Sequence, residues 1–299
     1  MRFKSLLAVL AIVGAAAVSA QAATAPKLFA DSQLVTEPRF SDEIIGHGPD
    51  VIFIPGLASS RETWKATAER LKDRFRVHLI QVAGFAGEPA RANASGPVVV
   101  PTAEAIDAYL VAQHLTPAVI VGHSLGGTMV LYLAESHGAD LKKGFIVDAL
   151  PFYPRLIGGP KATPESMRPM ADAIRSGKSQ MTDAQAAQFM ASMATAKSDQ
   201  DIIAGWRRAS DKTTVANALA DDFTLDLGPG LADITVPLTL IYPDYVRLGT
   251  PPGTTDKIYR GAYAADTHMT FVRADNSLHF IMFDQPAQFA EALDAFLAD

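Results

Sequence analysis

The residues best suited to covalent chemistry lie at positions 122 to 126, whose sequence is Gly-His-Ser-Leu-Gly. The apolar stretch 118 to 121 predicts a short buried strand before them, and the residues from Gly127 onward predict a helix after them. A serine between small neighbours on a sharp strand-to-helix turn is typical of a nucleophile elbow, because glycines let strand and helix approach closely around a strained backbone. The helix N-terminus also aims backbone N–H groups at the same point. We therefore expect Ser124 to be a nucleophile.

A serine hydroxyl needs a base within hydrogen-bonding reach, and the base needs a group that orients it. His279 is the best placed of the seven histidines, because it lies in a polar loop between the last predicted strand and the last predicted helix. In a parallel sheet such loops carry the functional side chains. His268 is a weaker alternative. His123, beside the serine, is expected to pack or hydrogen-bond near the substrate rather than to act as the base.

The elements that must position these residues alternate between strand and helix patterns. Strands are predicted at 43–46, 51–54, 76–82, 118–121, 144–147, 238–242 and 269–272, and helices at 61–72, 102–114, 127–134, 255–264 and 285–297. This order indicates a mostly parallel sheet with helices on both faces, an α/β fold. Residues 151–220 instead carry methionines at helical spacing and no strand-like run. They predict a helical cap or lid inserted into a core formed by 24–150 and 221–299.

The amino-acid composition indicates a globular protein and excludes several kinds of partner and chemistry. Hydrophobic residues make up 48% of the chain and charged residues 19%, enough for one large core with an insertion. The formal net charge of −6 is spread without basic blocks, which argues against binding nucleic acid or anionic membrane surfaces. Cysteine is absent, so disulfides and thiol chemistry are excluded.

Residues 1–23 resemble a signal peptide. Arg2 and Lys4 form a basic start, an apolar stretch runs from Leu6 to Val18, and Ala-Gln-Ala at 20–22 is a small-residue cleavage site. The apolar run is short for a membrane span. We therefore expect a secreted or periplasmic protein.

With these motifs in place, the chain resembles the serine esterase and lipase-like branch of the α/β-hydrolase fold. The resemblance rests on the elbow, on Pro-Gly-Leu at 55–57, on the helical insertion, and on the segment 279–286 that begins with His279. It implies the chain order nucleophile, acid, histidine, and hydrolysis through an acyl-enzyme without metal or organic cofactor. A serine at the elbow, rather than an aspartate, disfavours dehalogenase and epoxide-hydrolase chemistry.

The resemblance also implies an oxyanion hole and a triad acid. Backbone N–H groups of Leu57 and Leu125 are expected to hold the oxyanion; Pro55 stands where the family usually has histidine, but the donor is backbone. Two residues compete for the acid. Asp148 ends the strand after the elbow helix, a place that some members use, whereas Asp244 follows the next strand but comes one or two residues early. We favour Asp148 and keep Asp244 as the alternative.

The expected function is a secreted serine hydrolase that cleaves small or medium carboxylic esters, using Ser124, His279 and Asp148. The cap methionines are expected to shape an apolar pocket together with His123, Phe152, Tyr153 and Trp206. The partner is a small-molecule ester, with neither nucleic acid nor stable membrane association. Two alternatives stay open. The same triad can serve an acyltransferase or a lactone or amide hydrolase, and the fold can serve a non-catalytic small-molecule-binding protein.

Overall fold

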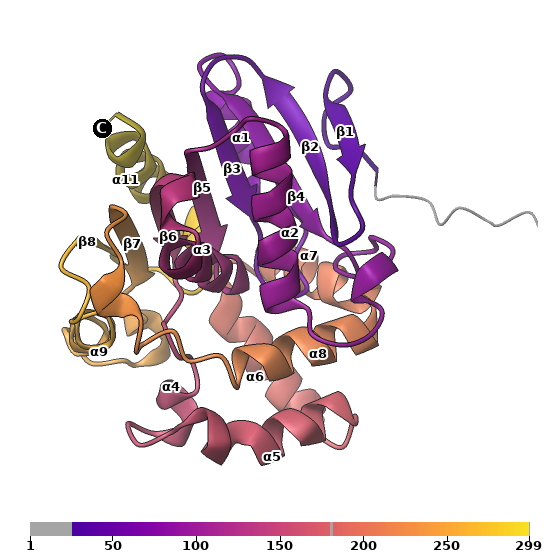
Figure 1. The fold of residues 1–299 in the computed structure, drawn as a ribbon. Helices are drawn as coiled ribbons and strands as arrows, with labels where there is room; N and C mark the ends of the chain where they lie inside the picture. The colour runs from indigo at the N-terminus through magenta and orange to yellow at the C-terminus, as the bar shows by residue number, and fades with distance from the viewer. Residues whose placement is uncertain (1–25, 180–181, 299) are drawn as a thin grey trace, which may run out of the picture.

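A computed structural model describes residues 26–179 and 182–298 and builds them around one central sheet (Figure 1). The segment 1–23, predicted to be a signal peptide, lies outside the described residues. Within them the sheet has eight strands in the order β1-β2-β4-β3-β5-β6-β7-β8. The strands are β1 Gln33–Thr36, β2 Phe40–Gly46, β3 Asp50–Ile54, β4 Arg76–Val82, β5 Ala118–His123, β6 Leu141–Val147, β7 Leu238–Pro243 and β8 Met269–Ala274.

Strand β2 pairs antiparallel with β1 and β4, and every pairing from β4 across to β8 is parallel. The predicted α/β fold with a mostly parallel sheet is therefore confirmed. Parallel strands carry their C-terminal ends to the same edge, so the residues that follow β3, β5 and β6 meet there.

Helices cover both faces of the sheet. Helices α2 (Val99–Ala112), α3 (Leu125–Ser136) and α9 (Thr254–Ala262) share one hydrophobic core with the sheet, and α1 (Lys65–Leu71) and α11 (Pro286–Ala298) share the other. The short α10 (Ile281–Asp284) directly precedes α11. None of the helices among the described residues is long and apolar enough to span a membrane.

Between β6 and β7 the described residues form five α-helices, which we call the cap. They are α4 Arg155–Gly158, α5 Pro164–Arg175, α6 Asp183–Met193, α7 Lys197–Ala209 and α8 Lys212–Asp222. The cap lies beyond one end of the sheet (Figure 1). It is fastened to the core by polar contacts. The Asp221 carboxylate accepts hydrogen bonds from the backbone N–H groups of Val98 and Val99 at the start of α2, at 2.6 and 3.2 Å.

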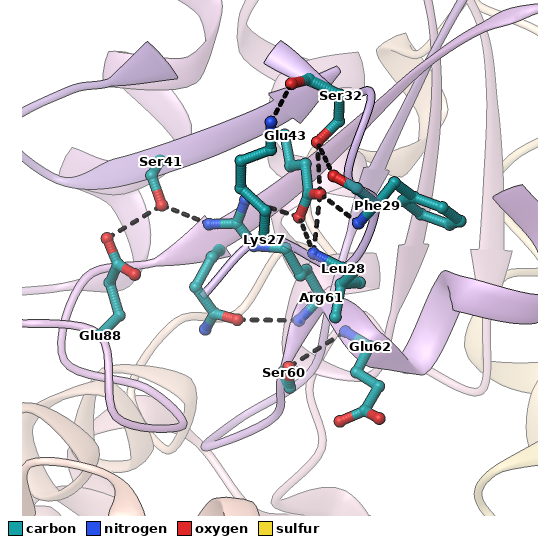
Figure 2. A network of polar contacts seen from close by, with 11 residues as sticks. Lys27, Leu28, Phe29, Ser32, Ser41, Glu43, Ser60, Arg61, Glu62 and Glu88 are labelled. Carbon is teal, nitrogen blue, oxygen red and sulfur yellow. Dashed lines mark hydrogen bonds and ion pairs between the residues drawn. The ribbon is translucent and has the colours of Figure 1, made fainter. Parts of the chain in front are cut away.

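Strand β2 is longer than predicted because it buries three consecutive polar residues, Ser41, Asp42 and Glu43. Figure 2 shows how two of them are satisfied. The Glu43 carboxylate accepts from the backbone N–H groups of Leu28 and Phe29 and lies 3.6 Å from the Arg61 guanidinium. Arg61, itself 1% exposed, also donates to Ser41. This network fixes the start of the 3-10 turn Arg61–Trp64, which directly follows loop 55–60.

Candidate active site

Ser124 occupies the strained turn between β5 and α3. Its backbone has φ 53° and ψ −121°, values that L-residues rarely adopt. The close approach of strand and helix explains the glycines on either side, because a Cβ added at Gly122 would collide with the Gly126 carbonyl, and one at Gly126 with the Ile54 carbonyl. The elbow predicted from residues 122–126 therefore has the expected geometry, and the serine side chain faces a cavity.

His279 lies against Asp148. Its Nδ1 is 2.6 Å from Asp148 Oδ2, and the two side chains are 18% and 2% exposed. Asp148 comes directly after β6 and is held in register by a hydrogen bond from its backbone N–H to the Ile241 carbonyl on β7. An Nδ1–H donated to a carboxylate leaves Nε2 free to accept a proton from a hydroxyl. Ser124, His279 and Asp148 all line one cavity.

Two tyrosines also donate to the Asp148 carboxylate. Tyr245 Oη is 2.6 Å from Oδ2, and Tyr259 Oη donates to Oδ1. Burial and the adjacent Asp148 charge raise the pKa of both phenols well above their usual value, so both stay protonated donors. Three donors thus converge on Asp148. Sequence reasoning missed both tyrosines, since each is far from Asp148 along the chain.

Asp244, the alternative acid, has a different environment. Its carboxylate accepts from the backbone N–H groups of Val246 at 3.2 Å and Asn276 at 2.9 Å, which makes it an anchor of the turn after β7. The structure therefore brings Asp148, and not Asp244, to His279.

His123 ties the elbow to the histidine loop. Its Nε2 lies 3.1 Å from the His279 backbone carbonyl, which can only accept, so Nε2 carries the proton. Burial, followed by the neighbouring His279, lowers the pKa of His123 well below its usual value, so the ring is neutral. The ring is 1% exposed and packs between His279 and Phe280. Its position suits orienting His279 rather than exchanging protons.

The two expected oxyanion donors flank the serine. Leu125 begins α3, so its N–H lies in the first turn, where helices leave backbone donors without an intrahelical partner. Leu57 follows Gly56, and a Cβ at Gly56 would stand 3.0 Å from Ser124 Cβ, so this loop packs directly against the serine. Leu57 and Leu125 both line the cavity.

The cavity has a volume of about 390 Å³ and lies between the elbow and the cap. His123, Tyr153, Met190 and Met193 line it, as expected, whereas the cap methionines Met167 and Met170 do not. The expectation for Phe152 and Trp206 is wrong. Phe152 is 2% exposed and packs inside the cap with Met167, and Trp206 turns away to donate its indole N–H to Glu62 at 3.2 Å.

Two charged residues of the cavity were not anticipated. Asp222, the last residue of α8, accepts a hydrogen bond from Thr128 on α3 at 3.4 Å. Burial raises the pKa of Asp222 to about 7. Arg207, on α7, places its guanidinium 5.2 Å from the ring centre of Phe189.

A possible metal-ligand cluster lies elsewhere. Asp107, His137 and Asp140 offer ligand atoms within 4.8 Å of one another. None of the three lines the cavity of Ser124. His137 is instead hydrogen-bonded to Glu104 at 3.0 Å, so this cluster takes no part in the arrangement described above.

The comparison with known families agrees with this geometry. Residues 51–292 match the model of the alpha/beta hydrolase family. The chain belongs to the alpha/beta hydrolase family. The resemblance inferred from the elbow and from the segment at 279–286 is therefore confirmed.

Individual relatives of this alpha/beta hydrolase are enzymes of several kinds. The pimeloyl-[acyl-carrier protein] methyl ester esterase of Chromobacterium violaceum is 32% identical over 38% of this chain and 42% of its own length, so the chain spans less than half of that relative. The N-formylmaleamate deformylase of Pseudomonas putida is 25% identical over 84% of this chain and 90% of its own. The enol-lactonase of Burkholderia xenovorans LB400 has the same fold, with a TM-score of 0.69 at 17% identity, covering 87% of this chain and 96% of its own.

Proposed function

We propose that this alpha/beta hydrolase cleaves small-molecule carboxylic esters through an acyl-enzyme on Ser124. The observation that carries the proposal is the 2.6 Å contact between His279 Nδ1 and Asp148, on the wall of the cavity that Ser124 faces. An esterase among the relatives supports the same reaction class.

In the first half of the reaction, Ser124 Oγ attacks the ester carbonyl carbon and its proton passes to His279 Nε2. Backbone N–H groups of Leu57 and Leu125 hold the resulting oxyanion. The intermediate collapses, the carbon–oxygen bond to the alcohol breaks, and His279 protonates the departing oxygen. Asp148, held by Tyr245 and Tyr259, stabilises the imidazolium in between.

In the second half, water attacks the acyl group on Ser124 and gives its proton to His279. The acyl–oxygen bond then breaks, the carboxylic acid leaves, and His279 returns the proton to Ser124. Every proton that moves is carried by His279, so the two halves need the same orientation of its ring.

The direct test is hydrolysis of short- and medium-chain p-nitrophenyl esters by the wild type and by Ser124→Ala. The variant is expected to lose at least about 10³-fold in kcat, because no other group supplies the nucleophile. Ser136→Ala, an exposed serine at the end of the same helix, is the matched control and should retain full activity. Equal turnover by the wild type and Ser124→Ala would contradict the proposal.

Amide or lactone cleavage by the same residues is the second candidate function. It is favoured by the deformylase relative, which matches most of both chains. Release of formate from an N-formyl amide at a higher kcat/KM than hydrolysis of any p-nitrophenyl ester would favour this second function over ester hydrolysis.

Export of the protein to the periplasm or beyond is a further proposal, and it rests on residues 1–23 alone.

A further inference from the structure

Arg207 is a cation inside a largely apolar cavity. It is the one lysine or arginine among the described residues that line the cavity of Ser124. Its side chain is half-buried, and its guanidinium packs over the ring of Phe189 from the neighbouring helix α6. That contact orients the guanidinium over the ring, and no other described residue accepts a hydrogen bond from its N–H groups.

The acidic groups of the cavity do not neutralise Arg207. Asp148 is committed to His279, Tyr245 and Tyr259. Asp222 is bonded to Thr128, and its raised pKa leaves it largely protonated below neutral pH. Burial lowers the pKa of Arg207, and no carboxylate among the described residues offsets that loss. Partial desolvation of a cation without a counter-charge costs free energy, so an anionic ligand that supplied the opposite charge would bind more tightly there than a neutral one.

The position of Arg207 relative to Ser124 indicates which part of a bound substrate would carry the negative charge. Ser124 lies at the core side of the cavity and Arg207 on the cap side, so the anion belongs to the substrate but not to the reacting ester. A guanidinium binds a carboxylate through two parallel N–H bonds. A single positive charge matches a monoanion better than a dianionic phosphate, particularly since Asp222 acquires negative charge above pH 7.

Resting on the proposed function, we propose that Arg207 binds a free carboxylate on the substrate, so that the preferred substrates are esters that carry a second, ionised carboxyl group. The carboxylate can belong to the acyl part, as in a half-ester of a dicarboxylic acid, or to the alcohol part, as in an acylated hydroxy acid. In either case Arg207 determines specificity and takes no part in bond breaking.

The kinetic test compares pairs of esters in which a free carboxylate is replaced by its neutral methyl ester. Cleavage of the shared ester bond is followed by product analysis, and the rate is corrected for the number of equivalent ester bonds. Monomethyl adipate against dimethyl adipate tests the acyl part, and 4-acetoxybutyrate against its methyl ester tests the alcohol part. In at least one pair the wild type is expected to prefer the acid by about tenfold or more in kcat/KM. Arg207→Gln is expected to reduce the preference on the order of 10- to 100-fold, since it removes a charged hydrogen-bonding pair. Arg208→Gln, the exposed neighbour on α7, is the control and should retain it.

A binding measurement separates this inference from the proposed function. Ser124→Ala protein is titrated calorimetrically with monomethyl adipate and with 4-acetoxybutyrate, with and without Arg207→Gln. Binding of either acid that is lost in Arg207→Gln supports the inference even where the wild type hydrolyses nothing. Ester hydrolysis without a preference for the acid in either pair, or with a preference that Arg207→Gln leaves intact, overturns the inference and leaves the proposed function standing.

Discussion

Asp148 orients His279 and so controls which tautomer of the imidazole faces Ser124. Replacing it by asparagine keeps the shape but offers an amide that can donate to Nδ1, which favours the wrong tautomer of the imidazole. Asp148→Asn is expected to lower kcat on p-nitrophenyl esters by about 10³- to 10⁴-fold. The measurement is steady-state kinetics near neutral pH.

Asp244→Asn is the matched control for that prediction. Asp244 anchors the turn after β7 through Val246 and Asn276, and an asparagine retains one of its two acceptor oxygens. Its kcat should therefore change several-fold at most. A larger loss in Asp244→Asn than in Asp148→Asn would show that the acid has been assigned to the wrong strand.

The roles of some single residues at the site could be predicted from the sequence, and those of others could not. Ser124 could be predicted because glycines, a strand and a helix surround it in a local pattern, and His279 because it lies in a polar loop between the last strand and the last helix. Tyr245 and Tyr259 could not, since their contact with Asp148 is set by the fold of two distant segments. For Trp206 and Arg207, the sequence could not show which of the two side chains faces the cavity. They are neighbours on α7, and the rotation of the helix decides that Arg207 faces the cavity while Trp206 faces Glu62.

At the scale of elements, His78 joins three strands. It lies on β4, 2% exposed, with Nδ1 2.7 Å from Asp42 on β2 and Nε2 3.0 Å from Asp50 on β3. Burial alone would lower the pKa of His78, but the hydrogen bonds and charges of the two carboxylates outweigh it and raise the pKa to about 9. The protonated ring therefore holds the three strands together at neutral pH.

This raised pKa predicts how stability depends on pH. A histidine whose pKa is higher in the folded chain stabilises the fold fully below its ordinary value of 6.5. The stabilisation, up to about 3 kcal/mol, is lost as pH rises through 9. Urea unfolding at about pH 6 and pH 9.5 should show that the wild type loses more free energy of unfolding than His78→Gln over this interval. An equal loss in both proteins would contradict the prediction.

The apolar parts of strands could be predicted from the sequence, whereas strands with buried polar residues could be predicted only in part. The apolar runs within β3, β5 and β6 have few alternatives to burial in a parallel sheet. Strand β2 was predicted only from residue 43, because the polar residues before it give no sequence signal for burial. They are buried because partners distant in the chain satisfy them, Arg61 for Glu43 and His78 for Asp42. The sequence shows which side chains are polar, but it does not show the hydrogen-bonding and charged partners that offset the cost of burying them.

At the scale of the whole molecule, the parallel sheet brings the ends of β5 and β6 and the loop after β8 to one edge, and the cap closes the cavity over that edge. The order of strands and helices was sufficient to predict this architecture and the helical insertion. The contacts that fasten the cap, such as Asp221 at the start of α2, depend on the final packing, and so does the position of Arg207 over the cavity.

In the proposed reaction, Ser124 carries the acyl group during turnover. The most direct measurement is mass spectrometry of protein quenched in acid while it hydrolyses p-nitrophenyl butyrate. We expect a butyryl group on the peptide that contains Ser124, absent from Ser124→Ala and formed far more slowly in His279→Ala. A butyryl group on another residue, or turnover in which acid quenching traps no acylated protein even when release of p-nitrophenol shows a burst, would contradict it.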